Sequence, residues 1–320
     1  MTSTAGSTAV NSQYSGQQNG VLHQRLHDFK TFLYNADNGT FLGRTGKSWA
    51  QIGLFYLVFY TCLAGFFAGM LAVFYYTLDW NEPRLKGSDS LLKLNPGVAF
   101  RPMPDVSTTL IRFERARTST IFPFVDHMAA FLQYYENELQ TTESGVIIDC
   151  ESVTQYRHKD DWDKACRFDI SYNLGTICVK EMALFGYQDG QPCVLLKLNK
   201  IYDWVPEPFD NTTLPADLKD ESGAPLNIWH EYYVTLKCEG ETPADKDMLG
   251  PILYYPSNGF HYKYFPFRNQ QGYRAPVVFV RFDNPGPAQL FMITCKIYAK
   301  NIEHNFMDKT GLVHFELLID

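Results

Sequence analysis

The chain has 320 residues, and its 35 acidic side chains outnumber 28 basic ones, which gives a formal net charge of −7. The basic residues are scattered rather than gathered into one patch, and this argues against nucleic acid as a partner. The 24 Phe and 20 Tyr residues favour a β-rich fold, because aromatic side chains suit a pleated, half-buried surface.

The stretch FLGRTGKSW, residues 41–49, ends like a phosphate-binding loop. Such a loop needs a first glycine five positions before its Gly-Lys pair, so that backbone N–H groups can wrap around a phosphate. Phe41 occupies that position, and Gly43 lies too close to Gly46 to replace it. A nucleotide-binding loop is therefore rejected.

An uncharged apolar segment follows, because no residue between Lys47 and Asp79 carries a charge. About 20 apolar residues are enough for a helix to cross the hydrocarbon core of a bilayer, and this run is longer. Trp49 and Tyr76 are placed near its two ends like interfacial aromatic anchors. We therefore predict one transmembrane helix over residues 49–78.

The orientation of this helix is not decided by Lys and Arg, which are balanced on its two flanks. Apart from Cys62 in the span, all six other cysteines follow it, as expected for disulfides in an oxidising compartment. The glycosylation sequon at Asn211 lies on the same side. We predict a type II protein with residues 1–48 cytosolic and residues 79–320 extracellular.

The extracellular part is predicted to begin with a Pro- and Gly-containing stalk over residues 79–105. Residues 124–139 place apolar side chains at helical spacing and are expected to form its one helix. Alternating apolar runs then favour strands at 231–238, 290–299 and 312–319.

Cys238 and Cys295 both continue an inward-facing apolar stripe of a predicted strand. We interpret them as a bridge between two sheets of an immunoglobulin-like sandwich with long loops. For the other four cysteines we favour sequential pairs, because near neighbours close short loops. Six cysteines allow fifteen pairings, so other pairings stay open. The favoured pairs are Cys150–Cys166, Cys178–Cys193 and Cys238–Cys295.

Two Asp-x-Asp patterns, at residues 161–163 and 245–247, match the metal-holding motif of glycosyltransferases, which are often type II proteins. The alternating β/α units that bind a nucleotide sugar are missing, so we interpret both as solvated loops. The histidines after the span show no metal-type spacing. We therefore expect no catalytic site, no metal and no cofactor.

The span has sequence features that a simple membrane anchor does not need. Gly65 and Gly69 form a small-x-x-x-small pair, which lets another helix approach closely. Tyr56 and Tyr60 share a helical face, and hydroxyls in hydrocarbon need partners. We interpret the span as a helix docked on a larger membrane protein; a lipid-facing helix is the alternative.

Residues 29–49, FKTFLYNADNGTFLGRTGKSW, combine an aromatic cluster, Leu-Gly-Arg-Thr and a Trp before the membrane. Three further stretches are LFYLVFYTCLAG at 54–65, PCVLLKLNKIYDWVPEPF at 192–209 and ITCKIYAKNI at 293–302. Together the four stretches resemble the β subunits of sodium/potassium-transporting ATPases, and the first is similar to the family's N-terminal signature.

The resemblance implies a non-catalytic subunit of a P-type cation pump in the plasma membrane. In the family this subunit stabilises the catalytic α subunit, assists its exit from the endoplasmic reticulum and tunes potassium affinity. The family's fold is immunoglobulin-like and its disulfides are sequential. The resemblance also implies contact with membrane lipid and allows a small single-span regulatory subunit as a further partner. The implied α-binding residues are Tyr56, Tyr60, Gly65, Gly69, Tyr254 and Tyr255.

Two departures mark the chain as a divergent family member. The stretch between Cys166 and Cys178 is longer than the family pattern, and the glycine that follows the cysteine there is absent. The family's Tyr-Tyr-Pro-Tyr-Tyr stretch is reduced to Tyr254, Tyr255 and Pro256. At these two places the family pattern therefore predicts neither the local loop structure nor a contact with the α subunit.

Three other functions are distinguishable. A proton/potassium pump β subunit is the near alternative, although one extracellular sequon disfavours the heavily glycosylated gastric form. A cell-adhesion glycoprotein working without a pump predicts that changes at Tyr56, Tyr60 or Gly65 leave surface delivery unaltered. A lumenal transferase predicts a metal-dependent activity that Asp161→Ala abolishes.

Overall fold

The computed structural model describes residues 24–25, 27–91, 95–141, 145–210 and 212–320. The chain divides into two compact units, with the boundary between Leu78 and Asp79. Each unit is described by itself.

The N-terminal unit combines a small antiparallel sheet with one long helix. Residues 27–33 are helical and lead into a sheet with the order β1-β2-β3. Leu42 and Gly43 connect its last two strands with φ of +51° and +73°. Positive φ at both central residues is the backbone of a tight type I′ hairpin turn. The elements are β1 (Tyr34–Asn35), β2 (Thr40–Phe41), β3 (Arg44–Thr45) and α2 (Gly46–Tyr76).

Helix α2 is 31 residues long, and none of them is buried. At a rise of about 1.5 Å per residue it measures about 45 Å, more than the roughly 30 Å hydrocarbon core of a bilayer. Among the described residues it is the one helix long and apolar enough to cross a membrane. The helix begins three residues before the predicted span and ends two residues earlier.

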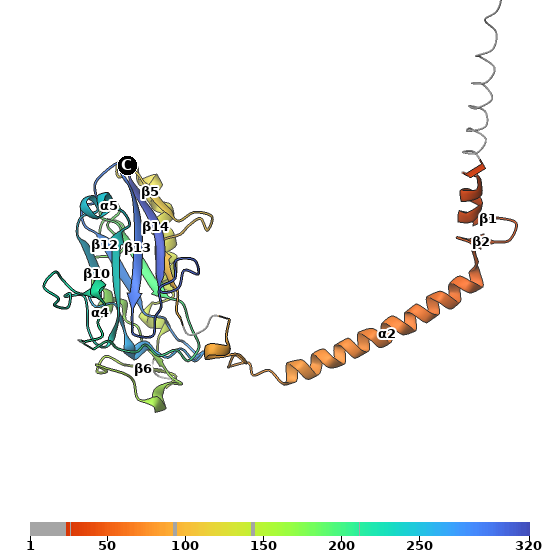
Figure 1. Ribbon diagram of the computed structural model, residues 1–320, viewed down its shortest axis with the longest axis horizontal. Coiled ribbons are helices and arrows are strands. Elements are labelled where there is room, and N and C mark those ends of the chain that lie inside the picture. The colour runs from red at the N-terminus through yellow and green to blue at the C-terminus, as the bar shows by residue number, and fades with distance from the viewer. Residues whose placement is uncertain (1–23, 26, 92–94, 142–144, 211) are drawn as a thin grey trace, which may run out of the picture. The chain divides into compact units, whose positions relative to one another are not determined.

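The C-terminal unit is built on two sheets, with strand orders β10-β12-β8-β4 and β11-β9-β13-β14-β5 (Figure 1). Their strands pair antiparallel except for the parallel pair β14–β5. A two-stranded parallel sheet of β6 and β7 lies apart from them. The strands are β4 (Val98–Arg101), β5 (Leu110–Phe113), β6 (Ile147–Ile148), β7 (Ala165–Cys166), β8 (Cys193–Leu198), β9 (Tyr233–Gly240), β10 (Ile252–Tyr255), β11 (Phe260–His261), β12 (Val277–Phe282), β13 (Leu290–Tyr298) and β14 (Leu312–Ile319).

The two large sheets share one hydrophobic core. Phe100 of β4 stacks on Phe315 of β14 with ring centroids 5.0 Å apart, and Phe282 of β12 meets the same ring edge-on. The alternation predicted for β9, β13 and β14 is confirmed. Its inward residues are buried, as at Leu236, Ile293 and Phe315. Burial of these apolar side chains is the main favourable contribution to folding.

The predicted bridge between sheets at Cys238 and Cys295 is wrong. The two cysteines are joined, but they lie on β9 and β13, neighbouring strands of the same sheet, and face each other in the register. The alternation correctly placed both side chains inward, because it reports the face of a strand. It does not report which strands are neighbours.

The predicted helix over 124–139 is shifted. Helix α3 runs from Thr118 to Gln133, and Leu139 is exposed. Tyr135 leaves the helix because its ring is buried and its hydroxyl donates to the carbonyl of Ala275 at 2.9 Å. A tertiary contact therefore ends the helix before its apolar pattern ends.

Other expectations for this unit also need correction. Two further short helices, α4 (Ile170–Leu174) and α5 (Pro243–Met248), accompany α3, so the expected single helix is wrong. Residues 98–101, assigned to the stalk, form β4 within the four-stranded sheet. The divergent stretch after Cys166 contains α4, with the Asp169 side chain accepting from the Tyr172 N–H at its start.

Candidate functional site

The glycine-containing motif before the span forms a collar at the start of α2, which we define as residues 34–49. The Trp49 indole N–H donates to the carbonyl of Phe41 at 2.8 Å, and the two rings lie 6.3 Å apart. The Arg44 guanidinium donates to the Ser48 hydroxyl at 3.5 Å. These contacts fold the collar onto the first turns of the helix.

The span presents two different faces. The rings of Tyr56 and Tyr60 stack with centroids 5.9 Å apart. Gly65 and Gly69 follow these tyrosines by nine residues each, about two and a half turns, and so lie on the opposite side of the helix. A Cβ added at either glycine would meet no atom within 4 Å. One face is therefore aromatic and hydroxylated, and the other is smooth.

The remaining polar groups near the glycine face are Thr61 and Cys62. The Thr61 hydroxyl donates to the carbonyl of Leu57 at 2.7 Å, within the helix. Cys62 is a free, exposed thiol. Thr61 is thus satisfied without a neighbouring helix, and its contribution to packing is its small size.

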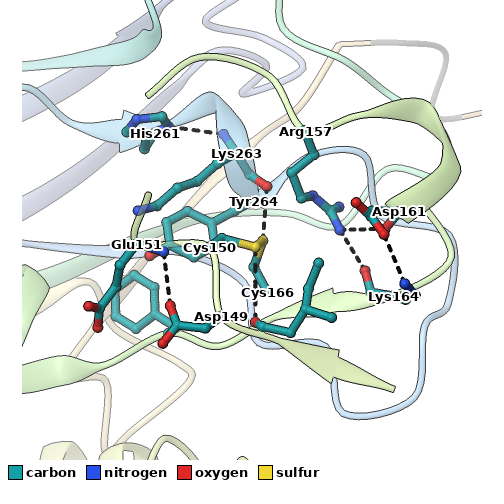
Figure 2. Close-up of a disulfide and its surroundings, with 12 residues drawn as sticks. Asp149, Cys150, Glu151, Arg157, Asp161, Lys164, Cys166, His261, Lys263 and Tyr264 are labelled. Atoms are coloured by element: carbon teal, nitrogen blue, oxygen red, sulfur yellow. Dashed lines mark hydrogen bonds and ion pairs between the residues drawn. A yellow bond between two sulfur atoms is a disulfide. The ribbon is translucent and has the colours of Figure 1, made fainter. Parts of the chain in front are cut away.

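Three disulfides stabilise the C-terminal unit, and they are the sequential pairs that the sequence favoured. Their Cα–Cα distances are 5.6 Å, 5.9 Å and 3.9 Å for Cys150–Cys166, Cys178–Cys193 and Cys238–Cys295. The first joins the segment after β6 to β7, as Figure 2 shows, and the second closes the loop that precedes β8.

Tyr254 and Tyr255 lie on β10, an edge strand of the four-stranded sheet. The Tyr254 hydroxyl accepts from the Cys238 N–H at 2.8 Å and faces its carbonyl at 3.4 Å. Burial raises the pKa of this phenol to about 12, so it stays protonated at neutral pH. Tyr254 thus directs its polar end toward β9, while both rings remain half-buried.

The sequon residue Asn211 lies outside the described residues. The side chains that follow it, Thr212 and Thr213, both bond to the carboxylate of Asp210, and all three are exposed. These bonds, led by that from the Thr212 hydroxyl, hold the pKa of Asp210 well below its usual range.

The two Asp-x-Asp patterns take different structures. Asp161 is half-buried at the end of a short 3-10 helix (Lys159–Asp161) and pairs with Lys164 at 2.9 Å. Asp245 is buried in α5, where its carboxylate and the Thr242 hydroxyl each accept a backbone N–H and form a capping box. The expectation of a solvated loop is therefore wrong for Asp245, whose role is to cap a helix. Among the described residues no cluster of His, Cys, Asp and Glu is arranged to hold a metal ion.

A cluster that sequence reasoning missed surrounds His314 on β14. Its Nδ1 contacts the Glu241 carboxylate at 2.7 Å, and its Nε2 contacts that of Glu316 at 2.8 Å. Burial lowers the pKa of His314, but the bonds and charges of the two carboxylates outweigh it and raise the pKa above its ordinary value. The alternation of His314 and Glu316 on the outer face of β14 was the available signal.

The comparisons with known proteins agree with one another. The family model for the sodium/potassium ATPase beta chain matches residues 19–315. The chain is 35% identical to "Probable sodium/potassium-transporting ATPase subunit beta-3" of Caenorhabditis briggsae, over 94% of this chain and 90% of the relative. It is 34% identical to sodium/potassium-transporting ATPase subunit beta-1 of Drosophila melanogaster, over 91% and 93%.

A more distant relative shows how far the likeness extends. Sodium/potassium-transporting ATPase subunit beta-2 of Homo sapiens is 28% identical over 93% of this chain and 96% of its own length. Alignments over so large a share of the chain include the collar, the span and the C-terminal unit together. The chain belongs to the sodium/potassium ATPase beta chain family.

Proposed function

We propose that this chain is the accessory, non-catalytic subunit of a sodium/potassium-transporting P-type ATPase, and that it stabilises the catalytic α subunit and delivers it to the plasma membrane. The single observation that carries the proposal is helix α2, an apolar helix with no buried residue and two dissimilar faces. Exposed tyrosine hydroxyls in hydrocarbon favour a protein partner, because lipid tails offer no hydrogen bond.

The two faces of α2 have separate roles in this proposal. Tyr56 and Tyr60 pack on the α subunit. Gly65 and Gly69 form the second packing surface, which suits close approach by another helix, such as a small single-span regulatory subunit. Tyr254 and Tyr255 contact α outside the membrane and contribute to its potassium affinity. Lipid covers the rest of the helix.

The orientation and the fold class belong to the same proposal. Residues 1–48 are cytosolic, residues 49–78 span the membrane and residues 79–320 are extracellular, with a glycan on Asn211. Three disulfides in the C-terminal unit support this orientation, since they persist in oxidising compartments. We assign the two sheets with one core to an immunoglobulin-like sandwich, with the parallel pair β14–β5 as a local departure.

The test is identification of the native partner. Native membranes are solubilised in mild detergent, this chain is captured, and co-purifying proteins are identified and quantified. A P-type ATPase α subunit at equal stoichiometry supports the proposal, and the ions it transports separate a sodium/potassium pump from a proton/potassium pump. A clean capture without any such pump overturns the proposal and favours adhesion.

A further inference from the structure

Five aromatic side chains of the N-terminal unit are exposed before α2 and in its first turn. We call them the aromatic surface; they are Phe29, Phe32, Tyr34, Phe41 and Trp49, and each has between 38% and 62% of its surface exposed. Exposed apolar surface on this scale marks a place that another molecule or a membrane covers.

Contacts within the unit hold the aromatic surface together. Tyr34 and Phe41 are register partners of β1 and β2, so their side chains lie on the same face of the small sheet. The Phe41 ring lies 6.3 Å from that of Trp49, and the Phe41 carbonyl accepts the indole N–H. The helix before the sheet is attached as well, because the Leu33 carbonyl accepts the Leu42 N–H at 3.0 Å. The aromatic surface therefore belongs to one folded unit.

The short helix before β1 has an apolar face. Phe29, Phe32 and Leu33 fall within about 100° of its circumference. Lys30 lies at the border of that face, where a long side chain keeps its charge in water while its methylene groups cover apolar surface. An apolar face bordered by a basic side chain is typical of helices that lie in a membrane interface.

The same part of the chain is basic. The described residues up to Trp49 include four basic side chains and two acidic ones, which leaves a net charge of +2 with His27 neutral. The basic residues are Arg25, Lys30, Arg44 and Lys47, and the acidic ones are Asp28 and Asp37. The Arg44 guanidinium donates to a hydroxyl, that of Ser48, and not to a carboxylate. Anionic lipids attract Lys and Arg that lie close to a membrane surface.

Helix α2 brings these rings and charges to the level of a membrane surface. Strand β3 ends at Thr45 and α2 begins at Gly46, so no linker separates them. The helix is about 15 Å longer than the hydrocarbon core, and its first turns can extend into the headgroup region. Trp49 stands in the first turn, and tryptophan is enriched at that level of a bilayer. Continuity with the span and the sign of the charge therefore both favour lipid as the partner.

We propose that the aromatic surface lies on an anionic lipid leaflet, with the rings of Phe29, Phe32 and Phe41 inserted among the headgroups. Lys30 and Lys47 lie beside lipid phosphates. The short helix rests on the leaflet by its apolar face and adds a surface anchor to the span. This inference rests on the membrane span and the cytosolic N-terminal side proposed above, and it does not depend on the α subunit.

The experiment uses the full chain without an α subunit, in nanodiscs of phosphatidylcholine alone or mixed with phosphatidylserine. Amide hydrogen exchange over residues 27–42 is followed by mass spectrometry, and we expect slower exchange when phosphatidylserine is present. Phe29→Ser should accelerate it about tenfold or more in both nanodiscs, because the burial of one Phe in the interface is lost. Lys30→Gln should accelerate it about fivefold, and only with phosphatidylserine.

Two further variants are the controls. Phe29 is 58% exposed, so its replacement removes no core contact, and Phe29→Leu should retain slow exchange because it keeps an apolar side chain. Phe306→Ser, at an exposed Phe of the C-terminal unit, should leave the exchange of residues 27–42 unaltered.

Two results would overturn the proposal when obtained with the chain alone: equal exchange in the two nanodiscs, or exchange that Phe29→Ser does not alter. Slow exchange that appears only after a P-type ATPase α subunit is reconstituted with the chain assigns the aromatic surface to that protein, and also overturns the proposal. Recovery of an α subunit from native membranes, which tests the proposed function, is a separate readout from each of these.

Discussion

The Tyr254 hydroxyl on β10 accepts a hydrogen bond from the Cys238 N–H on β9, and so connects the edge strand of the four-stranded sheet to the five-stranded sheet. Beside β9, strand β11 pairs only with Tyr233 and Val234. The Cys238 N–H therefore lies beyond the end of β11, and a side chain from the other sheet takes the place of a strand.

Tyr254→Phe should destabilise the C-terminal unit by about 1–2 kcal/mol, because a backbone N–H in a half-buried place loses its acceptor. The free energy of unfolding of the full chain in detergent, from urea titration, measures this. Tyr255→Phe is the matched control, since no hydrogen bond of the Tyr255 hydroxyl occurs among the described residues. Equal loss in both variants would mean that the hydroxyl contact is not stabilising.

Gly65→Leu and Tyr56→Leu should separate the two faces of α2. On the proposed function, Tyr56→Leu weakens recovery of the α subunit after capture, because the aromatic face loses a hydroxyl and ring area. Gly65→Leu, which fills a smooth surface, should reduce recovery of whichever helix packs there. Phe66→Leu is the control, because Phe66 lies about 100° around the helix from Gly65 and about 80° from Tyr56, between the two faces, and it should change neither recovery. Unaltered recovery in both test variants would instead favour a lipid-facing helix.

The free energy of unfolding should depend on pH through the protonation of His314. Since its pKa is raised above 6.5, the stability it adds is fully present below that pH and is lost as the pH rises through the folded-state value. Burial raises the pKa of Glu316, but bonds to Thr109 and His314 outweigh it and lower the pKa. The Glu316 contribution is therefore lost as the pH falls below 4.5.

The measurement is the unfolding midpoint of wild type and His314→Gln across both ranges. The stability difference between them should shrink as the medium becomes alkaline, and the resonance of the His314 imidazole should titrate above the value of a free histidine. A difference independent of pH above neutrality contradicts this assignment.

Gly43→Ala should weaken the collar. Gly43 adopts φ of +73°, where a side chain costs about 1–2 kcal/mol, and its new Cβ would also meet the Phe32 ring at 3.4 Å. Faster amide exchange at Leu42, which donates to the Leu33 carbonyl at 3.0 Å, measures the loss. Gly39 has φ of +60°, and a Cβ added there would meet no atom within 4 Å. Gly39→Ala therefore measures backbone strain alone, whereas Gly43→Ala adds the contact with Phe32.

The sequence predicted features that depend on local pattern. The uncharged run predicted α2, and the alternation around Ile293 and Phe315 predicted inward faces, because both patterns follow from the geometry of one element. Contacts between residues that are distant in the chain could not be predicted from the sequence. The end of α3 depends on Tyr135 meeting Ala275, and the position of the Cys238–Cys295 bridge depends on which strands are neighbours.

The candidate sites divide in the same way. Tyr56, Tyr60, Gly65 and Gly69 could be singled out because helical spacing alone relates them. The contact of Glu241 with His314 could not, since 73 residues separate the two in the chain. Asp245 gave a misleading metal-like pattern because a capping carboxylate and a metal ligand are the same residue type.

Strand β5 pairs only with β14 among the described strands, and about 200 residues separate the two. During synthesis β5 therefore emerges long before its neighbour exists, and its paired state waits until residues 312–319 have been made. Long-range pairing of this kind is slow, because the chain must lose the entropy of closing a large loop before any stabilising contact forms. A chain that ended before Leu312 would leave β5 unpaired and Phe100 without the Phe315 ring on which it stacks. The five-stranded sheet of the C-terminal unit can therefore be completed only after the last strand, β14, has been made.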